Sequence, residues 1–164
     1  MLYLLDANVL ITAHRQYYAI DRVPEFWEWL IFMGSEYSIK IPLEVFEEFS
    51  GGKDNLAIWA NQAEVENALL LDESVNIAIV RDVISNGYAS DLTDDELETV
   101  GRDPFLIAYA LADHGNRTVL TIEFSKPTRK RAKRHIPDVC NYYGVPCCNT
   151  FEMTTILDFK TGWK

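Results

Sequence analysis

Short apolar runs alternate along this chain with longer stretches whose apolar residues recur at helical spacing. Each run is short enough to form a buried strand, and the runs lie at residues 2–5, 38–41, 118–122 and 145–148. Many of the helical stretches begin or end at proline, glycine or capping residues. They lie at residues 24–34, 42–51, 55–70 and 74–86, after Thr93, at 103–115, after His135 and at 151–159. Strands that alternate with helices predict an α/β fold, with a mostly parallel sheet between helices on both faces.

The size and composition of the chain predict one domain. With 164 residues, 48% of them hydrophobic, the chain is long enough for one substantial core and too short for two comfortable ones. No apolar run approaches the roughly 18 residues of a membrane helix, and the N-terminus lacks the basic and apolar regions of a signal peptide. We therefore expect a single domain over residues 1–164, located in the cytoplasm.

Three cysteines are present, Cys140, Cys147 and Cys148. An odd number that includes an adjacent pair is poorly suited to a disulfide framework, so we expect reduced thiols. A zinc site built from these thiols and His135 is the weaker alternative.

The formal net charge of −10 conceals a strongly basic segment. Residues 126–135 hold six of the 15 Lys and Arg residues and no acid, so the rest of the chain has nine basic and 25 acidic residues and a charge of −16. The overall acidity argues against a nucleic-acid coat protein, because phosphate binding needs basic surface. The basic segment attracts a polyanion or an acidic partner, and a solvated loop is the plainer interpretation.

Two acids directly follow apolar runs. Asp6 comes after the run at 2–5 and Glu123 after the run at 118–122, and the carboxyl ends of parallel strands meet at the edge of a sheet where ligands bind. Asp6 is flanked by apolar residues on both sides, so its burial is costly unless it is paired, capped or bound to a metal. Asn8 either orients Asp6 by a hydrogen bond or stabilises a turn.

Three further acids have ordinary structural explanations. Asp103 precedes Pro104, a position that suits the N-cap of a helix. Glu44 and Glu48 lie on the polar face of an amphipathic helix. Their spacing of four residues places like charges together at a small cost, which a nearby cation would relieve.

The order of these motifs resembles the PIN-domain nuclease family, which includes toxins of the VapC type. The resemblance covers about residues 2–125 and is carried by the segments Leu4–Ile11, Ile41–Phe49, Arg102–Ala110 and Val119–Glu123. It implies a three-layer α/β/α sandwich and cleavage of RNA that depends on Mg²⁺ or Mn²⁺. The basic segment and the residues after it are longer than a typical VapC ending and resemble an uncharacterised PIN-like subgroup.

The resemblance assigns the site residue by residue. The catalytic acids are Asp6, Glu48, Asp103 and Glu123, of which Asp6, Asp103 and Glu123 bind the metal and Glu48 binds the metal or orients its water. Asn8 and Thr121 support these ligands. Glutamate at position 123 is a departure, because the family usually has aspartate there. Further candidate acids are Glu44 and Asp138, although the helix dipole also explains an aspartate in the first turn of a helix.

An acidic site repels phosphate, so contacts to the RNA backbone must come from nearby cations. The candidates are Arg102, Lys126, Arg129, Lys130, Arg131, Lys133 and Arg134.

These features predict a metal-dependent endoribonuclease that hydrolyses RNA phosphodiester bonds, and a role as the toxin of a toxin–antitoxin pair. Carboxylate oxygens select Mg²⁺ or Mn²⁺ over zinc. Two alternatives stay open. One is a PIN-like binding module that has lost catalysis and docks a protein such as an antitoxin. The other is a structure-specific DNA nuclease at the same site, because the acids do not distinguish RNA from DNA.

Five aromatic residues are candidates for base stacking: Trp27, Trp29, Trp59, Phe105 and Tyr109. Their helical spacing favours a core or an interface instead. The aromatic face of the helix at 24–33 therefore predicts a homodimer.

Overall fold

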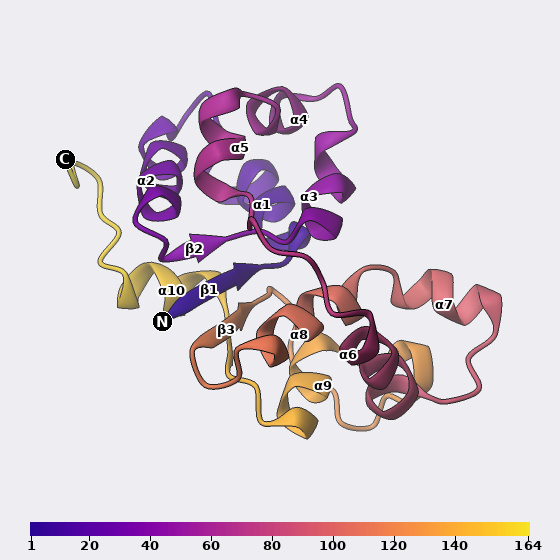
Figure 1. Cartoon of the computed structure of the whole chain (residues 1–164). Helices are drawn as coiled ribbons and strands as arrows, with labels where there is room; N and C mark the ends of the chain where they lie inside the picture. The colour runs from indigo at the N-terminus through magenta and orange to yellow at the C-terminus, as the bar shows by residue number, and fades with distance from the viewer.

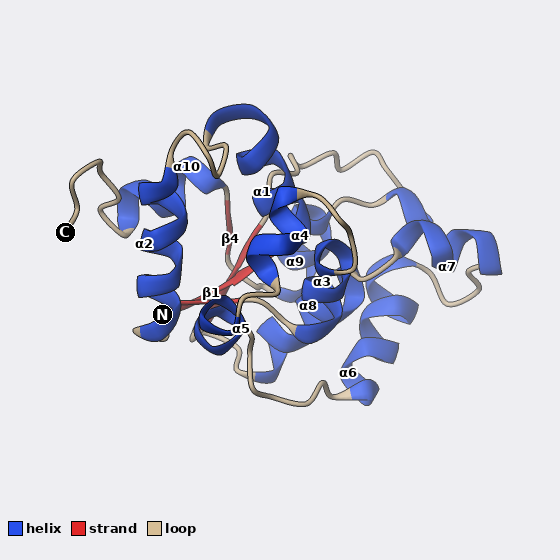
Figure 2. Cartoon of the chain, turned by 90° about the horizontal axis from the view of Figure 1, so that it is seen from above, coloured by secondary structure: helices blue, strands red, loops and turns tan.

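The computed structural model describes all 164 residues and contains one parallel sheet of four strands in the order β2-β1-β3-β4. The strands are β1 (Leu2–Leu5), β2 (Ile39–Lys40), β3 (Arg117–Leu120) and β4 (Cys147–Cys148). The central pair is in register from Leu2 opposite Arg117 to Leu5 opposite Leu120. Every residue of β1 and β3 is buried, as expected for parallel strands covered on both faces, and Figure 2 shows helices on either side of the sheet.

Ten α-helices surround the sheet: α1 (Ala7–Thr12), α2 (Pro24–Ser35), α3 (Leu43–Ser50), α4 (Asn55–Ala60), α5 (Ala63–Leu69), α6 (Ile77–Asp82), α7 (Asp94–Val100), α8 (Asp103–Ala112), α9 (Ile136–Tyr143) and α10 (Thr150–Ile156). Two π-helical segments, η1 (Ala13–Tyr17) and η2 (Val83–Tyr88), continue α1 and α6, and a short 3₁₀ turn forms η3 (Arg131–Lys133). Figure 1 shows α2 to α5 on one side of the sheet and α6, α8 and α9 on the other. The α/β class, the parallel sheet and the three-layer sandwich are thus confirmed.

Two of the expected helices are interrupted. The stretch at 55–70 forms α4 and α5, which are separated by Asn61 and the extended residue Gln62. An unbroken helix over this stretch would be about 24 Å long and would carry its second half away from α2. The break lets Leu56 and Leu69 both face the core. The stretch at 74–86 begins later, at Ile77, and ends in the π-helical segment η2.

Most of the aromatic residues singled out by the sequence lie inside the chain. Trp27, Trp29, Trp59 and Tyr109 are buried members of a hydrophobic core of 39 residues, so they are not surface platforms for base stacking. The aromatic face of α2 packs within the chain in the same way and leaves Phe32 as its exposed aromatic residue. A homodimer therefore stays a prediction, but this face no longer supports it. No helix is both long enough and apolar enough to cross a bilayer.

The strand order creates a switch point between β1 and β3. From β1 the chain crosses first to β2 on one side and later to β3 on the other side. In open parallel sheets, ligands bind outside the carboxyl ends of strands at such a point. Asp6 follows β1 and Thr121 follows β3, so both lie at this position.

The contact between α2 and α5 predicts a sharp response to one methyl group. A Cβ at Gly34 would lie 2.6 Å from the carbonyl oxygen of Ala68 and 2.7 Å from Cδ2 of Leu69. We expect Gly34→Ala to lower the free energy of unfolding by about 1–3 kcal/mol, because the helices must separate. Urea denaturation measures this loss. Gly51→Ala is the matched control, since its nearest neighbour would lie 3.9 Å away, and an equal loss in both variants would contradict the packing argument.

Candidate functional site

Asp6 is held at the end of β1 by two hydrogen bonds. It is the N-cap of α1, and its Oδ1 accepts the backbone N–H of Asn8 at 3.4 Å. Its Oδ2 accepts the hydroxyl of Thr121 at 2.9 Å, which ties β1 to the segment after β3. The side chain is only 4% exposed. Burial raises the pKa of Asp6 above its ordinary value, the nearby charge of Glu123 adds to the rise, and the hydrogen bonds oppose it.

Asp103 is the first residue of α8 and does not act as a cap. The N-cap is Arg102, and no side chain caps this helix. Instead, Asp103 Oδ2 accepts the hydroxyl of buried Tyr88 at 3.4 Å. Burial, followed by the charges of Asp6, Glu123 and Glu48, raises the pKa of Asp103 well above its ordinary value. The N-cap interpretation is therefore wrong, and Asp103 faces the other acids.

Glu48 and Glu123 complete the group from α3 and from the loop after β3. Desolvation and the charge of Asp6 raise the pKa of Glu48, while Arg102 opposes the rise. Oε2 of Glu123 accepts the backbone N–H of Ile136, the first residue of α9, at 2.8 Å. The same oxygen lies 3.9 Å from Nδ1 of His135. Glu123 is thus shared between the acids and the start of α9.

We call Asp6, Glu48, Asp103 and Glu123 the carboxylate cluster. Their charges act on one another although they come from four separate segments, and this is the arrangement that the resemblance predicted. Their oxygens are the donors preferred by Mg²⁺ and Mn²⁺. No three His, Cys, Asp or Glu side chains in the chain form a ready ligand set for an ion. The donor chemistry therefore fits a hard divalent ion, while the side chains are not closed around one.

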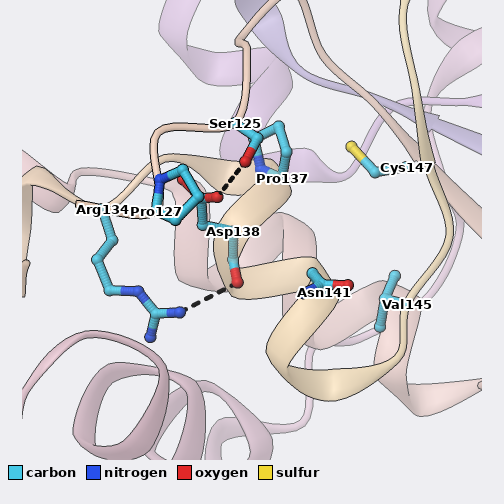
Figure 3. A pocket seen from close by; sticks show the side chains of 8 residues that line it. All are labelled: Ser125, Pro127, Arg134, Pro137, Asp138, Asn141, Val145 and Cys147. Carbon is cyan, nitrogen blue, oxygen red and sulfur yellow. Dashed lines mark hydrogen bonds between the residues drawn. The ribbon is translucent and has the colours of Figure 1, made fainter. Parts of the chain in front are cut away.

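The two additional acids do not join the cluster. Oε2 of Glu44 is buried without a hydrogen-bond partner. Its carboxylate lies near Tyr109, whose pKa is raised by burial and then by Glu44. Asp138 accepts the hydroxyl of Ser125 at 2.6 Å and the backbone N–H of Lys126 at 2.8 Å. Asp138 therefore anchors the loop after β3 to α9, as Figure 3 shows.

A hollow of about 550 Å³ lies between this loop and α9. Its wall includes Arg134, Asp138, Asn141 and Cys147 (Figure 3). Arg134 donates to the backbone oxygens of Asp138, at 3.0 Å, and of Gly87. The guanidinium that gives this hollow its positive charge is thus already engaged in holding α9 and η2 together.

The basic segment divides into free and paired cations. Lys126, Arg129, Lys130 and Lys133 are exposed and make no side-chain ion pair. Arg131, in contrast, pairs with Asp91 and Glu96, each at 2.7 Å. The hydrogen bond from Arg131 and that from the backbone of Thr93 hold the pKa of Glu96 down to about 2. Arg131 therefore fastens the basic segment to α7 and presents less free charge than its neighbours.

Arg102 lies beside the cluster on the α8 side. Its guanidinium is 3.7 Å from Glu47 and 5.6 Å from the ring centre of Phe105. Both contacts leave it partly exposed. It is the one predicted phosphate contact from outside the basic segment, and it already lowers the local negative charge.

Sequence reasoning missed two residues that touch the cluster, Tyr88 and His135. Tyr88 lies at the end of η2, two residues beyond the helix predicted over 74–86, and no local signal places it against Asp103. The Nδ1 atom of His135 is buried and has no hydrogen-bond partner. Its position at the end of the basic segment, directly before Ile136-Pro137, was visible in the sequence, but its proximity to Glu123 depends on the fold.

All three cysteines carry free thiols, as predicted. Cys140 and Cys147 contact each other between α9 and β4, and this contact raises the pKa of Cys140 and lowers that of Cys147. No zinc-type group of three ligands is present.

The fold and the site together define an α/β protein with a carboxylate cluster at the switch point of a parallel sheet. The chain matches the family described as a domain of unknown function, DUF4411, over residues 3–161, and it belongs to that family. No curated protein matches the chain.

The raised pKa of Asp103 predicts a pH-dependent stability in the absence of divalent ions. The folded state binds this proton more tightly than the unfolded state, so stability falls as pH rises from the ordinary aspartate pKa through the raised one. Burial is the largest cause of the raised pKa, the charges of Asp6, Glu123 and Glu48 add to it, and the hydrogen bond from Tyr88 opposes it.

We therefore expect Asp103→Asn to raise the free energy of unfolding at about pH 8 by on the order of 1 kcal/mol, since each tenfold change in proton affinity is worth about 1.4 kcal/mol. The gain should shrink toward about pH 5. Urea denaturation in EDTA measures both values. Asp21→Asn is the control, because Asp21 is exposed. The same gain in both variants would show that net charge, and not the cluster, is responsible.

Proposed function

We propose that this protein is a Mg²⁺- or Mn²⁺-dependent endoribonuclease of the PIN-like type that acts in the cytoplasm. The observation that carries the proposal is the buried carboxylate of Asp6, bonded to Thr121 where β1 and β3 end. The pKa of Asp103 agrees with it, because burial and then the charges of Asp6, Glu123 and Glu48 raise that pKa. Four acids held at such a cost, at the carboxyl edge of a parallel sheet, are explained by a cation that removes the cost. The motif order that resembles PIN nucleases supports the same assignment.

Each residue has a distinct part in the proposed hydrolysis. Asp6, Asp103 and Glu123 would hold the ion, which would supply Lewis-acid stabilisation of the charge that develops on the phosphate. The Thr121 hydroxyl fixes the orientation of Asp6. Glu48, whose pKa is raised, accepts the proton of the attacking water. The P–O3′ bond breaks as the water oxygen bonds to phosphorus, and the leaving oxygen takes up a proton from solvent.

The basic side chains supply what the cluster lacks. Lys126, Arg129, Lys130 and Lys133 are exposed and unpaired, so they are free to contact RNA phosphates. Such an enzyme suits the toxin of a toxin–antitoxin pair, whose antitoxin would cover the same cations. An assay with both nucleic acids distinguishes cleavage of RNA from cleavage of DNA at this site.

We expect Asp6→Asn and Asp103→Asn each to lower the rate of Mn²⁺-dependent cleavage of single-stranded RNA by roughly 100-fold or more, because each removes charge from the ion's ligands. Thr121→Val should cost about tenfold, since it removes only the hydrogen bond that orients Asp6. Cleavage of labelled RNA and DNA of matched sequence, with EDTA as the blank, provides the measurement. Asp21→Asn is the matched control, and full activity of Asp6→Asn would refute the assignment.

Two observations favour a second function, a binding module without catalysis. Oε2 of Glu123 already accepts the Ile136 N–H, and no three candidate ligands form a closed set. The two functions differ in metal affinity, because a ligand stabilises only the state that binds it. A nuclease should show a Mn²⁺-dependent rise in melting temperature that Asp6→Asn abolishes, and a binding module should show no rise.

The division of the basic segment predicts two different mutant phenotypes. We expect the double variant Lys130→Gln, Lys133→Gln to weaken RNA binding and to reduce the slope of log affinity against log salt by roughly 1.4, or about 0.7 for each lost phosphate contact. Arg131→Gln should change the slope less and lower the melting temperature, because Arg131 pairs with Asp91 and Glu96. Fluorescence anisotropy over a salt series measures the slopes. Equal slopes for the double variant and the unmodified protein would exclude these lysines as phosphate contacts.

A further inference from the structure

An aromatic groove of about 300 Å³ lies beside the loop that carries Glu123. Its wall includes Gln16, Tyr17, Ile122, Phe124, Asn149 and Phe151. We call it the Phe124 groove. Three segments that are distant in sequence form it: the end of α1 with η1, the loop after β3, and the start of α10.

The aromatic side chains of this groove are unusually exposed. Phe124 is 76% exposed, Phe151 57% and Tyr17 37%. The rings of Tyr17 and Phe151 pack against each other with centres 5.6 Å apart, whereas Phe124 is in no such ring pair. Exposed aromatic faces gathered on one wall mark a surface that binds something, since isolated apolar residues are common on surfaces but clusters are not.

The groove adjoins the loop that carries Glu123 of the cluster. Ile122 and Phe124 are the two neighbours of Glu123 in the chain, and Gln16 and Tyr17 belong to the helical segment that begins after Asp6. On its other side the chain reaches Lys126, the first cation of the basic segment, two residues after Phe124. A polymer that follows this loop from Glu123 to Lys126 passes Phe124.

Charge indicates which part of such a polymer enters. The protein has a formal charge of −10, and the adjacent cluster repels phosphate. An uncharged planar group gains from the aromatic faces without that repulsion. The amide of Gln16 is exposed, and Oδ1 of Asn149 accepts the N–H groups of Phe151 and Glu152, which leaves the Asn149 NH₂ free to donate. Flat apolar walls with amide groups at the side match a nucleobase.

We infer that the Phe124 groove binds one unpaired base of single-stranded RNA and positions the neighbouring phosphate at the carboxylate cluster. The inference rests on the proposed nuclease function and adds a base-recognition site to it. Binding by stacking requires a base that is free of its partner strand. The protein therefore prefers single-stranded to duplex RNA, and part of its affinity is insensitive to salt.

The test measures binding separately from cleavage. Asp6→Asn protein is titrated into a short single-stranded RNA that carries the fluorescent base 2-aminopurine at one position, and into the same RNA with an abasic site there. Stacking should quench the emission. In this background we expect Phe124→Ala to weaken binding by about tenfold and to abolish the quenching. Phe124→Leu, which keeps apolar contact without a ring, should also lose the quenching.

The abasic RNA should bind the parent protein about tenfold more weakly than the intact RNA and should be insensitive to Phe124→Ala. Phe32→Ala, which removes an exposed aromatic residue of α2, is the matched control and should change nothing. Because Phe124 is so exposed, its replacement leaves the core intact, and a urea melt verifies this. Equal binding of both RNAs by parent and Phe124→Ala protein would overturn the inference. A change in sedimentation without a change in RNA binding would assign the groove to self-association and overturn it as well.

Cleavage by protein with Asp6 intact separates this inference from the nuclease proposal. Mn²⁺-dependent cleavage together with base-independent binding overturns the groove alone. Base-dependent binding without any cleavage upholds the groove as an RNA site and overturns the nuclease.

Discussion

Electrostatic repulsion among four carboxylates is the constraint on which the site depends. Asp6, Glu48, Asp103 and Glu123 come from four segments, and the fold brings their charges close enough to raise pKa values within the group. Hydrogen-bond donors around the acids partly offset this repulsion. Thr121 donates to Asp6, Tyr88 donates to Asp103, and the backbone of Ile136 donates to Glu123. These donors reduce the cost of the cluster without removing it, and a divalent cation would remove the rest.

Two features outside the cluster are proposed to bind RNA: the cations of the basic segment by charge and the Phe124 groove by stacking. An acidic protein cannot hold a polyanion by its net field, so the unpaired cations of the basic segment are concentrated in one loop. Arg131 and Arg134 hold that loop to α7, η2 and α9, which leaves the lysines and Arg129 to solvent. Phe124, which lines the groove, lies two residues before Lys126, the first cation of this loop. Together, loop and groove allow a proposed RNA substrate to approach a site that repels its backbone.

Much of this architecture was visible in the sequence because its determinants are local. The apolar runs at 2–5 and 118–122, the capping box at Thr93 and the proline that opens α8 each specify an element within a few residues. Asp6 and Glu123 could be named because strand ends converge in parallel sheets, whereas Glu48 and Asp103 were assigned by the resemblance to PIN nucleases. The break between α4 and α5, the contact of Tyr88 with Asp103 and the pairing of Arg131 with Glu96 could not. These features arise from packing between segments that are distant in sequence, and the spacing of apolar residues does not predict such packing.

The longer side chain at position 123 connects two parts of the molecule that aspartate would leave separate. One of its oxygens satisfies the free N–H at the start of α9, and α9 in turn anchors the loop of free cations through Asp138. A cation held by this carboxylate would therefore share it with the helix start. An ion held at the acidic centre would thus be coupled through Glu123 and α9 to the cationic loop, and such coupling is reciprocal.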